Sequence, residues 1–169
     1  MPLIKNNQIT EDTWLTLDDE QALPVPHQDI IVSFDRWLQE RVDLINYDGR
    51  LGIRLKSDQP PSLIQGLIQH IDLVALEFPA YTDGRAYSYA RLLRDRYGFV
   101  GEIRAVGDVL RDQAFYMQRC GFDSFEVADA SALPGWLDSL RDFTLVYQPA
   151  ADQRSFVVHQ RHVTALAAE

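Results

Sequence analysis

The sequence contains little cysteine, no long hydrophobic run and fewer basic than acidic residues, and each shortage excludes a class of protein. The only cysteine, Cys120, cannot form an internal disulfide. No apolar stretch resembles a signal peptide or is long enough to cross a bilayer. The chain has 16 Lys and Arg residues but 25 Asp and Glu residues, so it lacks the clustered positive charge of nucleic-acid-binding proteins. We therefore expect a cytoplasmic protein whose partners include neither nucleic acid nor a membrane.

Motifs for dinucleotides and for metals are also missing. No G-x-G-x-x-G turn follows any predicted strand. His159 and His162 have no acid or cysteine ligands at metal-binding spacing, so we predict no metal site. Cys120 falls in line with the apolar positions of a predicted helix, which favours burial over a redox role. The sequence identifies no cofactor and no catalytic residue.

The length and the pattern of apolar segments indicate one α/β domain. A chain of 169 residues is close to the usual size of a single domain. Residues 1–28 are polar and irregular, which predicts an N-terminal arm or a short hairpin. Residues 29–147 alternate compact apolar segments with amphipathic ones, as the α/β domain of a parallel sheet does. Residues 148–169 form a C-terminal tail; apolar alternation at 143–147 and at 156–158 predicts extended structure at an edge or across a partner.

The predicted strands and helices alternate along the α/β domain. Strands are expected at residues 30–33, 51–56, 72–78, 100–106 and 122–127, and helices at 35–41, 61–71, 84–97, 109–120 and 132–140. Because helical crossovers of sufficient length separate the last four strands, these strands should run parallel in one sheet. About five parallel strands can form an open sheet or a partial TIM-like barrel, and alternation alone leaves both arrangements open.

The turns after the third and fourth predicted strands hold the first candidate site. Ligands of parallel sheets and barrels bind at the carboxyl ends of the strands. Asp83, Gly84 and Arg85 follow one such strand, and Asp108 follows the next. Thr82 or Asp83 would cap the following helix, Gly84 would let the backbone approach a ligand, and Arg85 could clamp an anion. The alternative is that Asp83 only caps the helix and Arg85 only pairs with a neighbouring acid.

A row of charged residues near the strand ends is the second candidate. Arg54, Glu77, Arg104 and Glu126 lie on consecutive predicted strands and alternate in sign. On neighbouring strands they would form a ladder of ion pairs along one rim of the sheet, which satisfies the charges without any ligand. Clustered ionisable groups are also how active sites are recognised. The sequence leaves both interpretations open.

Four segments carry a resemblance to a known family: GRLGIRL at 49–55, FPAYTDGRAYSYARLLRDRYGF at 78–99, GEIRAVGDVLRDQ at 101–113 and RCGFDSFEV at 119–127. They are similar to segments of an uncharacterised bacterial family, domain of unknown function 934. The resemblance also includes Trp14 and residues 34–37, and so it covers most of the chain. Because members are commonly encoded beside sulfite reductase and some are labelled oxidoreductases, the resemblance implies a role in assimilatory sulfur metabolism. It implies no catalytic residue.

We therefore expect an accessory protein of assimilatory sulfite reduction. It would bind a small anion, such as a sulfur oxyanion or a phosphorylated molecule, or the sulfite reductase itself, and a homo-oligomer stays open. The alternative is a small α/β enzyme, an oxidoreductase by the family's label, with its active site at the carboxyl ends of the strands. In that case Glu77 or Asp108 is a general acid or base, and Arg85 or Arg104 stabilises negative charge.

Overall fold

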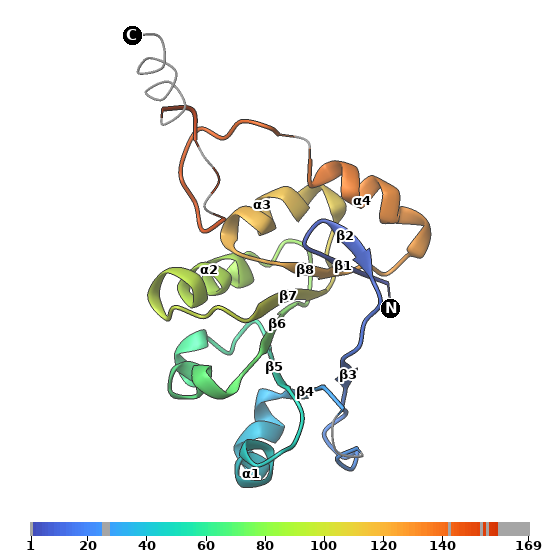
Figure 1. Cartoon of the computed structure of the whole chain (residues 1–169), viewed down its shortest axis with the longest axis vertical. Helices are drawn as coiled ribbons and strands as arrows, with labels where there is room; N and C mark the ends of the chain where they lie inside the picture. The colour runs from blue at the N-terminus through green and yellow to red at the C-terminus, as the bar shows by residue number, and fades with distance from the viewer. Residues whose placement is uncertain (1, 25–27, 142, 153, 155, 159–169) are drawn as a thin grey trace.

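The chain folds around one eight-stranded sheet that curls into a half-barrel (Figure 1). The computed structural model describes residues 2–24, 28–141, 143–152, 154 and 156–158. The strand order is β2-β1-β8-β7-β6-β5-β4-β3. The strands are β1 (Leu3–Lys5), β2 (Gln8–Thr10), β3 (Leu15–Thr16), β4 (Ile30–Ser33), β5 (Leu51–Leu55), β6 (Leu73–Phe78), β7 (Glu102–Gly107) and β8 (Ser124–Glu126).

Most of the sheet is parallel. Every neighbouring pair from β3 to β8 is parallel, which confirms the five predicted strands and the parallel arrangement of the last four. β1 and β2 form an antiparallel hairpin whose turn residues Asn6 and Asn7 have positive φ, and β1 also pairs with β8. The sheet has more strands than predicted because residues of the arm add a strand or a hairpin at each edge.

The helices mostly occupy the predicted segments. They are α1 (Phe34–Ile45), α2 (Arg85–Arg91), α3 (Ala114–Cys120) and α4 (Leu133–Ser139), with a π-helical turn η2 (Leu92–Arg96) and the 3-10 helices η1 (Pro61–His70), η3 (Arg111–Gln113) and η4 (Ala130–Ala132). The segment predicted as a helix at 61–71 is 3-10 rather than α. Pro60 and Pro61 remove two amide donors at its start and Gly66 is a weak helix former, so regular α-helical hydrogen bonding is disfavoured there.

The two faces of the sheet differ in what covers them. Side chains alternate along each strand, so Val74 and Leu76 pack in the large core with the helices, whereas Leu73 and Ala75 face the other way. This second face, which we call the inner face, carries a small apolar cluster: Trp14, Ile31, Leu73, Ala75 and Val106. Because Trp14 belongs to the arm, the arm covers part of the inner face.

The segment that follows α4, including the described part of the C-terminal tail, packs against α3. Its two predicted extended stretches contact each other through one parallel bridge between Val146 and Phe156, not through an edge of the sheet. The Phe143 ring lies 4.9 Å from that of Phe115 in α3. Among the described residues, no helix combines the length and the apolar character needed to cross a membrane.

Candidate functional site

Three polar side chains share the inner face where consecutive parallel strands end. Ser33 is the last residue of β4, and Arg54 and Glu77 are the next-to-last residues of β5 and β6. Their neighbours Val32, Leu55 and others of the same strands face the helices, and alternation therefore turns these three to the opposite side. The carboxyl ends of parallel strands are where barrel proteins bind their ligands.

A cavity of about 310 Å³ lies at this end of the sheet. We call it the strand-end pocket. Its lining combines strand residues with residues of the arm: Thr16, Leu17, Asp18, Asp19, Val32, Ser33, Arg54, Lys56 and Glu77. Ligand pockets span roughly 300–1,000 Å³, so this one is at the small end of the range.

Residues 16–19 of the arm form one wall of the pocket, and two hydrogen bonds hold that wall. The Ser33 hydroxyl donates to Asp19 at 2.5 Å and also accepts the amide of Arg36, so it caps α1 as well. The Arg36 side chain is 3% exposed and donates to the main-chain carbonyl of Asp18 at 2.7 Å. A buried arginine bound to this carbonyl fixes the course of the arm across the strand ends.

The charges of the pocket are only partly paired. Arg54 donates through Nε to Glu77 at 3.2 Å, and Lys56 binds Asp35 at 2.6 Å, a hydrogen bond that raises the pKa of Lys56. Asp18 lines the pocket, and its carboxylate makes no hydrogen bond or ion pair with any residue that the structure describes. The terminal nitrogens of Arg54 make no hydrogen bond with a described residue either. Two opposite charges are therefore available to a ligand.

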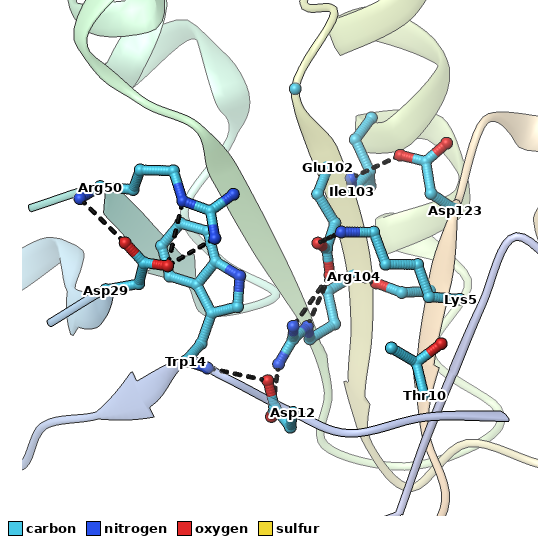
Figure 2. A network of polar contacts seen from close by, with 12 residues as sticks. Lys5, Thr10, Asp12, Trp14, Asp29, Arg50, Glu102, Ile103, Arg104 and Asp123 are labelled. Carbon is cyan, nitrogen blue, oxygen red and sulfur yellow. Dashed lines mark hydrogen bonds and ion pairs between the residues drawn. The ribbon is translucent and has the colours of Figure 1, made fainter.

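A buried polar network centred on Arg104 occupies another part of the inner face (Figure 2). Arg104 is 0% exposed and donates through Nε to Glu102 at 2.9 Å and through Nη1 to Asp12 at 2.8 Å. Its Nη2 lies 2.9 Å from the same Glu102 oxygen but is not oriented to donate a hydrogen bond. Glu102 also accepts from Lys5 and from Ser124, each at 2.6 Å. We call these residues and Glu126 the inner-face network.

The arm covers the Arg104 side chain of this network. Asp12 accepts the amide of Trp14 at 3.2 Å while it binds Arg104 (Figure 2). The Arg50 guanidinium stacks 4.9 Å from the centre of the Trp14 ring and pairs with Asp29. Because side chains of the protein satisfy most of its polar atoms, the network joins the arm to the sheet without requiring a ligand.

The two glutamates of the network have pKa values shifted in opposite directions. Burial by itself would raise the pKa of Glu102, but Arg104, Lys5 and Ser124 together outweigh burial and lower it. Burial raises the pKa of Glu126, and its attraction to Arg104, whose Nη1 is 3.7 Å away, does not compensate. Glu102 is therefore held as a carboxylate, whereas Glu126 takes up a proton more readily than an ordinary glutamate.

The predicted ladder of four charges exists as two separate pairs. The contacts Arg54–Glu77 and Arg104–Glu126, at 3.2 and 3.7 Å, confirm cross-strand ion pairing. The prediction that all four charges lie along one rim is wrong for Arg104, which is fully buried. Arg104 lies at the same level of the sheet as Arg54, since both are opposite Ala75 of β6, but Asp12 of the arm binds it there and it is not exposed at the rim.

The Asp83-Gly84-Arg85 turn follows β6 as predicted, but its charges bind each other. Asp83 accepts the Arg85 amide at 3.2 Å and two guanidinium nitrogens at 3.0 and 2.6 Å, which holds the pKa of Asp83 well below its usual value. Arg85 also donates to Ser57 at 2.8 Å. Gly84 is the N-cap of α2, and no side chain of the turn belongs to the lining of the strand-end pocket. This is the contact expected if Arg85 pairs with a neighbouring acid.

Asp108 holds the same loop from the next strand. Its carboxylate accepts the amide of Tyr81 at 2.9 Å, and Gln113 donates to the Tyr81 carbonyl at 2.9 Å. The residue before it, Gly107, has φ +94°, and a Cβ there would lie 2.5 Å from the Phe78 carbonyl oxygen. Of the residues that the sequence singled out, Arg54 and Glu77 line the strand-end pocket, whereas Asp83, Gly84, Arg85, Arg104 and Asp108 do not.

The other candidates for metal or redox chemistry are poorly placed. Cys120 is 7% exposed, and burial raises the pKa of its thiol, so it is a protonated packing residue at neutral pH. The described part of the chain contains no group of three or more His, Cys, Asp or Glu residues that could hold a metal ion. His159 and His162 lie outside the described residues.

Sequence reasoning missed the half of the pocket that comes before β5. Thr16, Asp18, Asp19 and Ser33 line it together with the residues that follow β5. A signal existed for Ser33, because a serine between an apolar strand and Asp35 is a helix N-cap at a strand end. Asp18 and Asp19 carried no such signal, since their position depends on the pairing of β3 with β4, which the sequence does not reveal.

Comparison with known proteins identifies the family. Residues 52–157 match a family described as a bacterial protein of unknown function (DUF934). The chain belongs to this family. No curated protein matches it. The DUF934 match includes Arg54, Glu77 and the inner-face residue Arg104, whereas Ser33 and residues 16–19 precede it. The strand-end pocket of this DUF934 protein thus combines the matched segment with the part of the chain ahead of it.

Proposed function

We propose that this DUF934 protein binds a small polar molecule in the strand-end pocket. The observation that carries the proposal is the cavity of about 310 Å³ in which Ser33, Arg54 and Glu77 converge from three consecutive parallel strands. Such strand ends are the usual ligand position in barrels, and a few polar groups in a small cavity are typical of binding sites. The turn at Arg85 is the weaker candidate, because Asp83 and Ser57 already bind its guanidinium.

We propose further that this binding serves assimilatory sulfite reduction, in which the protein acts as an accessory to the reductase. The support is the resemblance of the four sequence segments to a family commonly encoded beside sulfite reductase. In this role the pocket ligand is a small metabolite, and contact with the reductase uses another surface of the molecule.

A second candidate function is that of a small enzyme, and one observation favours it. The Glu77 side chain is 27% exposed inside the pocket and is held by Arg54 at 3.2 Å. A partly exposed carboxylate can give or accept a proton, and an adjacent guanidinium can stabilise developing negative charge. In this function Glu77 is the general acid or base, and Arg54 replaces the predicted Arg85 and Arg104 as the stabilising cation.

A ligand screen by thermal shift tests the binding site. Sulfite, sulfate, phosphate, phosphorylated cofactors and amino acids are added at fixed ionic strength to the wild type, Glu77→Gln and Arg85→Ala. We expect at least one compound to raise the melting temperature of the wild type and of Arg85→Ala, but not of Glu77→Gln, since a ligand stabilises only the state that binds it. If no compound stabilises the wild type, or if only Arg85→Ala loses the response, the strand-end pocket is not the site.

A further inference from the structure

The strand-end pocket offers its ligand one charge of each sign. Asp19 is bound by Ser33, Lys56 is bound by Asp35, and Glu77 is bound by Arg54. Asp18 has a carboxylate with no hydrogen bond or ion pair to a described residue, and Arg54 uses only Nε. The available groups are therefore the carboxylate of Asp18 and the terminal nitrogens of Arg54.

These two groups disfavour ligands whose charge is all of one sign. A small dianion would meet Arg54 but would also face the carboxylates of Asp18, Asp19 and Glu77. A simple amine would meet Asp18 but would also face the cations Arg54 and Lys56. A zwitterion satisfies both groups at once, because a guanidinium binds a carboxylate through two parallel hydrogen bonds and a carboxylate binds an ammonium group.

Size and shape restrict the zwitterion further. A cavity of about 310 Å³ is near the lower limit of ligand pockets, which favours a single small molecule over a peptide. Leu17 and Val32 are the apolar members of the lining, but both are buried in the large core, so the part of the lining that a ligand meets is mainly polar and offers no room for a large apolar side chain. The hydroxyl of Thr16 adds a further hydrogen-bonding group to the lining.

We infer that the ligand of the strand-end pocket is a free α-amino acid with a small side chain. Arg54 binds its carboxylate, and Asp18 binds its ammonium group. This inference rests on the proposed function of the pocket and specifies the class of its ligand. Asp18 belongs to the arm and Arg54 to β5, so the two ends of the ligand join the arm to the sheet.

The test compares each amino acid with its two halves. The common amino acids are titrated calorimetrically into the full chain, and every one that binds is compared with its deaminated acid and its decarboxylated amine: propionate and ethylamine for L-alanine, mercaptopropionate and cysteamine for L-cysteine. We expect an amino acid to bind and both halves to bind at least about ten-fold more weakly, because each half lacks one charge-assisted contact.

Variants of Arg54 and Asp18 test whether these residues bind the carboxylate and the ammonium group of the amino acid. Arg54→Lys, Arg54→Gln and Asp18→Asn should each weaken the amino acid at least about ten-fold. The matched controls Arg41→Gln and Asp43→Asn change exposed residues of α1 that form no hydrogen bond with a described residue, and they should leave affinity unchanged. Arg54→Lys keeps the charge beside Glu77, so it separates loss of the two-pronged contact from loss of fold.

The outcomes distinguish the ligand class from the pocket itself. If the acid half or an inorganic oxyanion binds as tightly as the amino acid, and Arg54→Gln abolishes that binding, the pocket is a site but the inference about amino acids is wrong. If amino acids bind equally well to wild type, Arg54→Gln and Asp18→Asn, the inference is also wrong. If neither amino acids nor any compound of the wider screen binds the wild type, the inference and the proposed function both fail.

Discussion

At the scale of single residues, Arg104 shows how a buried charge fixes the arm to the sheet. The guanidinium is completely buried and contacts acids from three parts of the chain: Asp12 in the arm, Glu102 in β7 and Glu126 in β8. Burial of a lone charge is costly, and these contacts offset that cost. The same contacts leave Arg104 no free group with which to bind a ligand, apart from the Nη2 atom that already touches Glu102.

Removal of the Arg104 side chain should therefore be strongly destabilising. We expect Arg104→Ala to lower the free energy of unfolding by about 3–5 kcal/mol, because it takes a completely buried cation away from the buried Glu102, which keeps only the cation Lys5, and from the partly exposed Asp12. The matched control is Arg91→Ala, which breaks an exposed pair with Asp95 and should cost less than about 1 kcal/mol. Urea unfolding measures both, and equal losses in the two variants would show that the network does not hold the arm.

The lowered pKa of Glu102 predicts a defined dependence of stability on pH. A carboxyl group whose pKa is lower in the folded state stabilises the fold above its ordinary value of 4.5, and this stabilisation is lost as the pH falls through the lowered value. The difference in unfolding free energy between wild type and Glu102→Gln should be largest at neutral pH and should shrink below about pH 4.5. Urea titrations from pH 7 to pH 3 measure it. A difference that stays constant over this range would contradict the assignment.

At the scale of elements, the sequence predicted the strands and helices that have a clear pattern of apolar residues within their own segment. The five strands between residues 30 and 127 are short apolar runs separated by helical segments, and all of them are present. β3 has two residues and no apolar run of its own, so it exists only because β4 offers it a partner. The site divides in the same way: Glu77 was visible at the end of an apolar strand, whereas the Asp18 and Asp19 wall depends on the path of the arm.

Substitution of two glycines, Gly107 and Gly84, tests which of the two turns needs a glycine for its backbone conformation. Gly107 ends β7 with φ +94°, and a Cβ would lie 2.5 Å from the Phe78 carbonyl oxygen, so we expect Gly107→Ala to cost about 1–3 kcal/mol. Gly84 has φ −85° and no atom within 4 Å of a Cβ, so Gly84→Ala should cost less than about 1 kcal/mol. Thermal and urea unfolding measure both changes. A large loss in Gly84→Ala alone would show that the Asp83-Gly84-Arg85 turn has a backbone requirement that the structure does not display.

At the scale of the whole molecule, the half-barrel exposes an inner face that a closed barrel would fill with side chains from all its strands. The arm replaces the missing half: Trp14 covers the apolar cluster and Asp12 completes the inner-face network (Figure 2). Beyond this cover, residues 16–19 reach the strand ends and form the wall of the pocket. The fold thus leaves the strand-end pocket, the proposed ligand position, at an end of the inner face that the arm borders without filling.

Growth on sulfate tests whether the pocket and the sulfur role belong together. In a bacterium that encodes this protein, deletion of the gene should slow growth on sulfate and leave growth on cysteine unchanged. The wild-type gene should restore growth, Glu77→Gln should not, and Gly84→Ala, which leaves the pocket lining intact, should restore it fully. Pull-down of sulfite reductase with wild type and Glu77→Gln then separates the two roles, because a pocket variant that still captures the reductase has lost only its ligand. Full growth of the deletion strain on sulfate would disprove the sulfur role, and full complementation by Glu77→Gln would show that the role does not use this pocket.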